Sequence, residues 1–600
     1  MDARTLIVES TDYKLSRKLL ARLWRLIRPY WVEKGNRLPR WVLAGMLALA
    51  PIMAGLTAWM AIVTKDMTNA IVAKDQARYA LLFWSTSGLG AATIATFIAT
   101  VYLSSWLNVH WRQWLTNYMV TRYLDKKTYY DIALREDLDN PDQRIQEQIP
   151  PFIEAVSDIP NKIISQTLAL ISGGLIMSSV SGTMMWYVIG YATVQTLVTL
   201  VMYTPMIRLQ FASTVAEADL RYGILHVREN AETVAFYRGE DSEHAQIWAR
   251  LKVTTRTKMA VLIYTVKLMG ATQAMRVVWQ LAPFFLIAPL FFQGKIEFGA
   301  MAMATTAAGT MLAALSTLSA FIPTLTAAAP GAVRLAQILE RFDEMDAERA
   351  RDDATNVVIK HGPLIVMDKV SLQTPGGEQQ LVRNLDLTLH PGEQLIVVGQ
   401  TGVGKSSLLR AMAGLWRRGT GTMVMPPIED AMFLPQRPYM ILSDLRAQLL
   451  YPRGRKDITD TELQVILERV CLPDLLQKHG GLNVVRDWAK VLSLGEQQRI
   501  GFARVLISQA HYVFLDEATS AVDIPTEALL YALLREAGTT YVSVGHRETI
   551  LHFHDRALCL YPGGSYRLMP AQELIASVGE VAGVVESTSE AEVAPAHVRE

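Results

Sequence analysis

The sequence has little cysteine and almost no net charge, and we expect that its N-terminus is not a cleavable signal. Cys471 and Cys559 lie far apart and outside any CxxC or Cys/His pattern, so we expect two reduced thiols rather than a disulfide or a metal site. The formal net charge of +1 gives no indication of a nucleic-acid partner. Residues 14–40 carry nine basic side chains against Glu33 alone, and they lack the short apolar core and cleavage site of a signal peptide.

Charge is also scarce along much of the first half, although the whole chain is 19% charged. A helix needs roughly 20 apolar residues to cross a bilayer, and six stretches approach or exceed that length. They are residues 41–64, 79–107, 163–181, 184–206, 275–292 and 300–328. The basic flank before the first predicts a cytoplasmic N-terminus, and six crossings then place the connections 108–162 and 207–273 and the C-terminal half inside as well.

The two long connections predict helices rather than loose loops. Residues 111–133 and 216–249 have apolar and aromatic side chains at helical spacing among charges. We therefore expect spans two to five to continue as helices into the cytoplasm. A turn is expected at the Asp-Asn-Pro-Asp sequence of residues 139–142.

The second half has the pattern of a soluble α/β domain. Short β-rich runs alternate with helical segments, as in a parallel sheet. The runs are 364–366, 395–398, 431–433, 512–515 and 540–544. A chain of 600 residues is too long for one core. The predicted domains are a basic cytoplasmic segment (1–40), a six-helix all-α transmembrane domain (41–340), a linker (341–362), an α/β nucleotide-binding domain (363–578) and a disordered tail (579–600).

A phosphate-binding loop follows the run 395–398. Residues 399–406 fit the pattern G-x4-G-K-[ST] between a strand and a helix, the context that the motif requires. Glycines let backbone amides turn toward phosphate oxygens, and the helix N-terminus adds positive potential. Lys405 would contact the β- and γ-phosphates, and the hydroxyl of Ser406 would bind Mg²⁺. The predicted nucleotide-binding residues of this loop are Gly399, Gln400, Thr401, Gly402, Val403, Gly404, Lys405, Ser406 and Ser407.

Two further segments carry chemistry. The apolar run 512–515 ends in Asp516 and Glu517, at the edge where a parallel sheet presents ligands. Asp516 suits a metal, and Glu517 suits polarising the attacking water of nucleotide hydrolysis. In Leu-Ser-Leu-Gly-Glu, residues 492–496, Ser493 and Gly495 would offer a hydroxyl and amides to an anion. On composition alone, this segment is only a helix start capped by Ser493, with Glu at its third position.

In this order and spacing, these elements resemble the ABC ATPase family. The resemblance implies a Q-loop glutamine at Gln436, which joins Ser406 and Asp516 near Mg²⁺, and a D-loop at 520–523 containing Asp523. It also implies that His546 is the switch histidine of catalysis beside Glu517, and that Ser493, Gly495 and Glu496 form the signature that closes over the phosphate loop of another subunit. We therefore expect a homodimer that binds ATP and Mg²⁺.

The sequence departs from the family pattern at two places. The signature has Leu494 where a glycine is commoner, but Ser493 and Gly495 remain, so we expect function to survive. The aromatic residue that usually stacks on adenine is absent, because Gln373-Thr374-Pro375 stands near its place. Adenine stacking is therefore unassigned.

The membrane half is similar to one branch, which contains the peroxisomal fatty-acyl-CoA half-transporters and the bacterial SbmA/BacA-like proteins. The segments of the membrane half that carry this resemblance are 111–116, 129–130, 139–145, 217–222, 228–232 and 235–240. In the ATPase half, 436–440 and 451–452 are shared too. The chain looks like the BacA-like proteins fused to an ATPase, the BclA-like transporters, which have an exporter-like fold. The resemblance implies import of peptides, including antimicrobial peptides, or of other bulky hydrophilic solutes across a bacterial inner membrane. Fatty-acyl or lipid-like cargo, and export, are the alternatives.

Polar residues within or near the spans are candidate cargo contacts. They are Gln166, Gln195, Arg276 and Gln280. Arg276 could instead snorkel, and glutamines can join helices. Two other classes of protein stay open. An anchored ATPase acting on DNA or ribosomes would need only one span, and an ATP-gated channel or sensor would not need Glu517 or His546.

Overall fold

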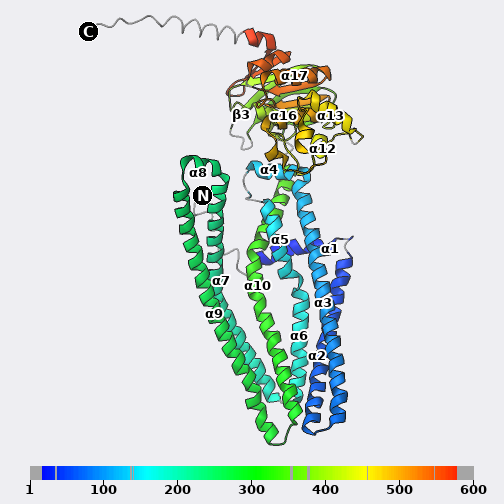
Figure 1. The fold of residues 1–600 in the computed structure, drawn as a ribbon, viewed down its shortest axis with the longest axis vertical. Helices are drawn as coiled ribbons and strands as arrows, with labels where there is room; N and C mark the ends of the chain where they lie inside the picture. Colours follow the sequence, from blue (N-terminus) through cyan, green and yellow to red (C-terminus); the bar gives the residue numbers. More distant parts are fainter. Residues whose placement is uncertain are drawn as a thin grey trace, which may run out of the picture. The chain divides into compact units, whose positions relative to one another are not determined.

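The computed structural model describes residues 17–33, 35, 37–135, 138, 141–180, 182–351, 356–374, 379–455, 457–545 and 547–576. The chain divides into two compact units, residues 1–347 and 348–600, each of which is described here by itself. The first unit is helical and the second is α/β, as the sequence predicted (Figure 1).

Long helices form the first unit. They are α1 (Arg17–Val32), α2 (Leu38–Val72), α3 (Gln76–Leu124), η1 (Asp125–Lys127), α4 (Thr128–Arg135), α5 (Pro141–Ser157), α6 (Ile159–Val180), α7 (Gly182–Glu229), α8 (Ala231–Tyr237), α9 (Glu240–Phe292) and α10 (Phe298–Arg351). Within the described residues, five helical stretches are long and apolar enough to cross a membrane: Leu38–Val72, Gln76–Arg135, Pro141–Val180, Met185–Glu229 and Phe298–Leu315. The sixth expected span, 275–292, is helical within α9 but contains side chains outside the described set.

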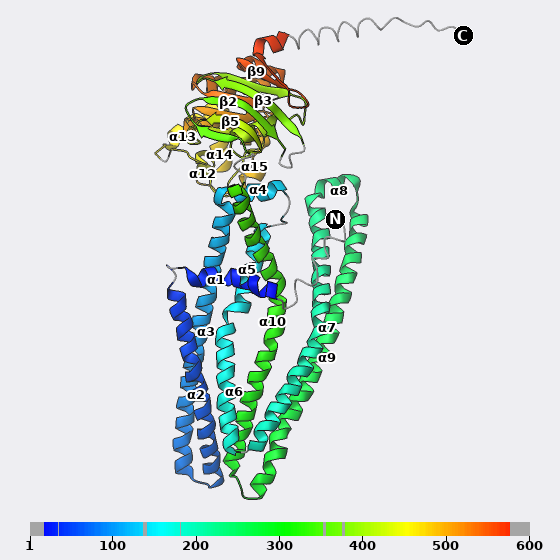
Figure 2. The same ribbon diagram turned by 180° about the vertical axis from the view of Figure 1, so that it is seen from behind.

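Several helices are much longer than a bilayer requires. The 53 residues of α9 extend about 80 Å at 1.5 Å per residue, whereas a hydrocarbon core is about 30 Å thick. The pair α7 and α9 runs side by side to a tip formed by α8, as both ribbon views show (Figure 2). Arg238 closes this tip with a left-handed backbone, φ 52°. The expectation that residues 111–133 and 216–249 of the long connections are helical is thus confirmed.

Helix α1 lies within the segment predicted only as a basic flank. It runs across the long helices rather than along them (Figure 2), and it buries Leu26 and Tyr30. The ring of Tyr30 stacks on Trp111 of α3 with centroids 4.9 Å apart. Aromatic burial of this kind stabilises the crossing of α1 with α3.

Ion pairs also connect α1 and α3 to the C-terminal part of α10. The guanidinium of Arg22 donates to both carboxylate oxygens of Glu340, at 3.0 and 3.1 Å. Arg122 of α3 lies 2.9 Å from Asp343 and 3.1 Å from Asp346. The first eleven residues of the expected linker are therefore the helical, ion-paired end of α10, which continues to Arg351.

Two sheets build the second unit. One has four strands in the order β1-β5-β2-β3, and the other has six in the order β10-β9-β4-β8-β7-β6. The strands are β1 (Val358–His361), β2 (Ile365–Gln373), β3 (Gln380–Leu389), β4 (Gln394–Gly399), β5 (Gly419–Met425), β6 (Ala431–Leu434), β7 (Tyr512–Asp516), β8 (Thr540–Val544), β9 (Arg556–Leu560) and β10 (Tyr566–Pro570). In the larger sheet β9, β4, β8, β7 and β6 are parallel, so their carboxyl ends share one edge.

Helices surround the six-stranded sheet. They are α11 (Lys405–Met412), α12 (Leu445–Leu450), α13 (Asp460–Arg469), α14 (Leu475–His479), α15 (Trp488–Val491), α16 (Leu494–Ser508), α17 (Ile524–Glu536) and η3 (Glu548–Phe553). Strands β4, β7 and β8 are almost wholly buried, as expected for strands covered on both faces. The core includes Ile396, Phe514 and Trp488, each at most 1% exposed.

Candidate nucleotide site

The predicted phosphate loop joins the end of β4 to the start of α11. Gly399, Gly402 and Gly404 have φ of 151°, 83° and 109°, which L side chains rarely adopt. A Cβ on Gly399 would also lie 2.5 Å from the carbonyl oxygen of Leu560. The glycines are thus required by the backbone itself. The loop leads directly into the N-terminus of α11, and a glycine-rich loop followed by a helix N-terminus is an arrangement that binds phosphate.

Lys405 is folded back over this loop. Its Nζ donates to the carbonyls of Gly399 at 2.6 Å and Gln400 at 3.0 Å, and the residue is buried. Burial lowers the pKa of Lys405, while the carboxylates of Glu517 and Asp516 act in the opposite direction. A cation held beside a glycine-rich loop at a helix N-terminus suits a polyphosphate.

Asp516, at the end of β7, meets Ser406 from the first turn of α11. The hydroxyl of Ser406 donates to Oδ1 of Asp516 at 2.9 Å. Burial raises the pKa of the Asp516 carboxyl, and the Ser406 hydrogen bond and the Arg410 charge partly offset that effect. The structure therefore brings together two of the three residues predicted to hold Mg²⁺.

Glu517 follows Asp516 with a left-handed backbone, φ 50°. Its amide donates to the carbonyl of Val544 in β8 at 3.0 Å, which fixes the turn. Nε2 of Gln436, which follows β6, donates to Oε2 of Glu517 at 2.8 Å. The predicted Q-loop glutamine and the predicted base are thus direct neighbours at the carboxyl edge of the sheet.

The predicted signature begins α16. The Oγ of Ser493 accepts the amide of Glu496 at 3.2 Å, and the Glu496 carboxylate accepts the amide of Ser493 at 2.8 Å. This capping box satisfies the helix start, as composition alone indicated. The hydroxyl proton of Ser493 is not used in that bond, so the side chain can still donate to an anion. A Cβ on Gly495 would lie 2.7 Å from the carbonyl oxygen of Ala521, so the signature touches the D-loop.

The D-loop precedes α17. Oδ2 of Asp523 accepts the amide and the hydroxyl of Thr526, at 3.2 and 3.1 Å, and caps this helix. These hydrogen bonds from Thr526 lower the pKa of Asp523. The predicted switch histidine, His546, lies outside the described residues. Its neighbour Arg547 donates to the D-loop carbonyls of Ser520 and Val522, each at 2.8 Å.

The donor set fits ATP with Mg²⁺. A lysine, a helix N-terminus and positive-φ glycines provide charge and amides for phosphate, as described above. Ser406, Asp516 and Gln436 offer a hydroxyl, a carboxylate and an amide, and Mg²⁺ prefers oxygen ligands of these kinds. When bound, the ion would neutralise charge that develops on the phosphates. Glu517 stands beside this set with its carboxylate held by Gln436.

Helix α16 buries three polar side chains whose burial the sequence did not predict: Gln497, Gln498 and Arg504. Arg504 is 5% exposed, and its guanidinium donates to the carbonyls of Gln448 at 2.7 Å and Tyr439 at 2.9 Å. Burial lowers its pKa to about 10. Gln498 is 1% exposed. In the sequence these residues look like ordinary polar positions of a helix. Their burial can be recognised only when it is known which face of α16 packs into the core.

The structure describes part of the segment 373–375, where an adenine-stacking aromatic residue would be expected. The carbonyl of Gln373 accepts the indole N–H of Trp416 at 2.7 Å, and Thr374 bonds to Gln379 through its amide at 2.9 Å. Pro375 lies outside the described residues. Because Trp416 is 9% exposed and committed to Gln373, it does not supply an exposed stacking face.

The polar residues proposed as cargo contacts lie on three helices of the first unit. Gln166 and Gln195 are half-buried in α6 and α7, and Arg276 is exposed on α9. The side chain of Gln280 lies outside the described set. A group that the sequence analysis missed stands at the junction of α5 and α6, where Asp158 accepts a hydrogen bond from Ser104 of α3 and lies 3.7 Å from Lys162.

Comparisons with known proteins agree with this geometry. Residues 27–292 match the family described as ABC transporter transmembrane region 2, and residues 382–520 match the family described as ABC transporter. An uncharacterised ABC transporter ATP-binding protein of Synechocystis sp. is 38% identical, over 88% of this chain and 82% of its own length. Arabidopsis thaliana ABC transporter D family member 2, chloroplastic, is 31% identical over 90% and 86%. The mouse lysosomal cobalamin transporter ABCD4 is 30% identical over 77% and 82%.

A helical membrane domain followed by a phosphate loop, a paired acid and a glutamine on one sheet edge defines an ATP-driven membrane transporter. The protein is a multi-pass membrane protein that binds ATP and couples its hydrolysis to transport. The chain belongs to the ABC transporter family and is homologous to its D-subfamily half-transporters.

Proposed function

We propose that Glu517 is the base of ATP hydrolysis, with Lys405 and the phosphate loop binding the phosphates and Ser406, Asp516 and Gln436 holding Mg²⁺. The observation that carries this assignment is the hydrogen bond of 2.8 Å between Gln436 and Glu517 at the edge that also carries the Ser406–Asp516 pair. We also propose that His546 is the switch histidine and that the domains have the limits predicted from the sequence.

The test is Glu517→Gln. The amide cannot accept a proton from the attacking water, so ATP should bind with unchanged affinity while turnover falls by about a thousandfold or more. Glu548→Gln is the matched control, because Glu548 is exposed and follows the neighbouring strand. Turnover of Glu517→Gln at the rate of the control would refute the assignment of the base.

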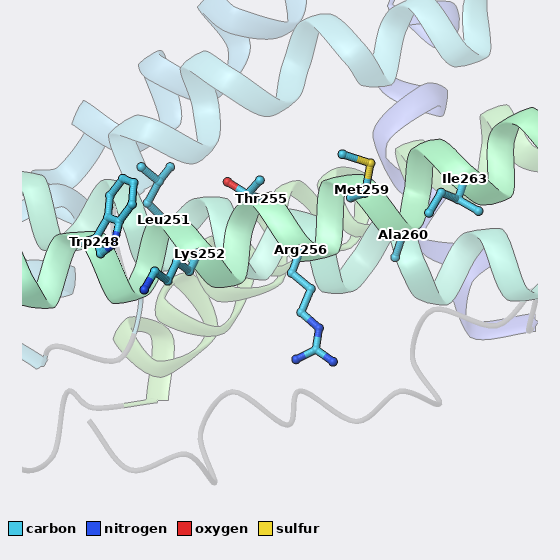
Figure 3. Close-up of a pocket in the computed structure, with 8 residues that line it drawn as sticks. All are labelled: Trp248, Leu251, Lys252, Thr255, Arg256, Met259, Ala260 and Ile263. Carbon is cyan, nitrogen blue, oxygen red and sulfur yellow. The ribbon is translucent and has the colours of Figure 1, made fainter.

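We propose that the working unit is a homodimer. Each chain carries one phosphate loop and one signature, so two chains provide two complete sites if the signature of one closes over the loop of the other. A shallow groove along α9 supports a contact between copies (Figure 3). Trp248, Met259 and Ile263 are each about half exposed along it, and a stretch of this length that is exposed in one chain is typical of an interface.

For cargo, we propose import of peptides, or of other bulky hydrophilic solutes, across a bacterial inner membrane, with the N-terminus and the ATPase domain in the cytoplasm. The resemblance to the SbmA/BacA-like branch supports this, and so does a relative named as a cobalamin transporter, since cobalamin is a bulky hydrophilic solute. The motifs of the ATPase do not depend on direction.

Direction is tested in cells exposed to a peptide that acts inside the cell. Cells that lack the protein should become more resistant, because the route of entry is lost. Greater sensitivity would indicate export. The alternative cargo is tested with vesicles that contain the protein, by comparing ATP-dependent transport of a labelled peptide with that of a labelled fatty-acyl-CoA. Transport of the fatty-acyl-CoA without transport of the peptide would support the lipid-like alternative.

A further inference from the structure

Gln498 occupies a crossing point of three segments of the ATPase domain. It lies on α16, one turn beyond the signature, and is 1% exposed. Its Nε2 donates to the carbonyl of Gln436 at 2.8 Å and lies 3.0 Å from the Oγ of Ser520. Its Oε1 accepts the amide of Ala521 at 2.9 Å. One side chain thus joins the Q-loop, the D-loop and the signature helix.

The chemistry of these partners fixes the orientation of the amide. A glutamine amide has two N–H donors on one end and an oxygen acceptor on the other. Here the NH₂ faces the Gln436 carbonyl and the oxygen faces the Ala521 N–H. A flipped amide would place oxygen against carbonyl and NH₂ against N–H. The side chain therefore has one satisfied arrangement, and moving any one loop breaks it.

Each joined segment carries a group assigned to the site. The Gln436 side chain donates to Glu517, so the position of the Q-loop backbone bears on the base. The carbonyl of Ala521 lies against Gly495 of the signature, closely enough that a Cβ there would be 2.7 Å away. Gln498 sits on the same helix as Gly495, three residues further along.

We propose that Gln498 is a positioning residue that makes the Q-loop, the D-loop and the signature move as one body. It touches no phosphate. It acts through Gln436 on Glu517, and through the D-loop on the surface that meets a second copy. This inference rests on the proposed roles of Glu517 and the signature.

Gln497 offers a matched control on the same helix. It is 6% exposed, and its Nε2 donates to the carbonyls of Ala489 at 3.0 Å and Leu492 at 2.8 Å. Those carbonyls belong to α15 and to Leu492, the first residue of the signature segment, so these two bonds of Gln497 reach neither the Q-loop nor the D-loop. A comparison of the two glutamines separates coupling of loops from simple satisfaction of buried polar groups.

The experiment compares Gln498→Met with Gln497→Met in the full chain, since methionine keeps the length and loses every hydrogen bond. Both variants should lower the melting temperature. Only Gln498→Met should lower kcat for ATP, by about tenfold, with the ATP KM changed less than about threefold. Equal kcat in the two variants would overturn the proposal.

Gln498→Glu keeps the proposal testable if the methionine variant fails to fold. An ionised carboxylate cannot donate and would oppose the Gln436 carbonyl, whereas a protonated carboxyl can donate one hydrogen bond and accept another. The kcat of Gln498→Glu relative to the wild-type protein should therefore rise as pH falls from 8 to 6, by about threefold or more. A ratio independent of pH would count against the proposal. If Glu517→Gln abolishes turnover while both tests on Gln498 fail, only this inference is lost.

Discussion

The buried imidazole of His554 gives the ATPase domain a defined response to acid. His554 directly follows η3 and packs against β8. Its Nδ1 lies 2.7 Å from the carbonyl of Ile550, and its Nε2 lies 2.8 Å from the hydroxyl of Ser543. A carbonyl can only accept, so Nδ1 carries the proton, whereas the hydroxyl of Ser543 can donate to a neutral Nε2 or accept from a protonated one. The rings of Tyr531 and Tyr541 meet the imidazole edge-on. Burial among these groups favours the neutral form of His554.

Burial lowers the pKa of His554 from 6.5 to about 4, aided by the charge of Arg535 and opposed by the hydrogen bond to Ile550. Between these pH values the unfolded chain binds the proton and the folded chain does not, so the free energy of unfolding falls as pH drops below 6.5. The full loss is about 3 kcal/mol below pH 4, and about 2 kcal/mol of it is reached by pH 5. Above pH 7 the effect vanishes.

The assay is thermal unfolding of the ATPase domain within the full chain in detergent, from pH 7.5 to pH 5, for the wild-type protein and His554→Gln. Glutamine remains neutral, so groups other than His554 contribute equally to both curves. The wild-type midpoint should fall by about 4–8 °C more than the variant midpoint over this range. Parallel curves would refute the assignment of the acid response to His554.

Two further variants test the packing around the site and in the membrane domain. Gly495→Ala should lower ATP turnover about tenfold, because its Cβ would lie 2.7 Å from the Ala521 carbonyl and displace the D-loop. Leu494→Ala is the control, and equal turnover in the two variants would contradict the contact. Arg22→Ala should destabilise the membrane domain by about 1.5–3 kcal/mol, because it leaves Glu340 without its bidentate partner. Arg28→Ala, on an exposed turn of α1, should leave its melting temperature unchanged.

Much of the fold could be predicted from local patterns in the sequence. Four of the five predicted β-rich runs lie within the parallel strands β4, β6, β7 and β8, because such strands are largely apolar and end at recognisable loops. The run 364–366 overlaps the start of β2, which is antiparallel to its neighbours. Strands β1, β3, β5, β9 and β10 were not predicted. In β3 and β5 the burial alternates, and charged or polar residues such as Arg383 interrupt the apolar run. The membrane helices followed from length and apolar composition, which a bilayer demands whatever the tertiary contacts.

Contacts between distant residues could not be predicted in the same way. Arg22 and Glu340 are 318 positions apart, and nothing in either neighbourhood specifies the other. Gln498 is an ordinary polar residue in sequence, and its role depends on the register of α16 against two loops. Ser406, Asp516 and Gln436 could be grouped from the sequence only through the resemblance to a family, because the spacing of motifs along a chain does not encode the distance between them.

The central claim is that hydrolysis at Glu517 drives cargo across the membrane. The most direct measurement uses vesicles that contain only this protein, with phosphate release and accumulation of labelled peptide followed together. ATP should support both phosphate release and peptide accumulation, and Glu517→Gln should lose both while still binding ATP. Peptide accumulation that continued at the wild-type rate in Glu517→Gln, or that required no nucleotide, would contradict it.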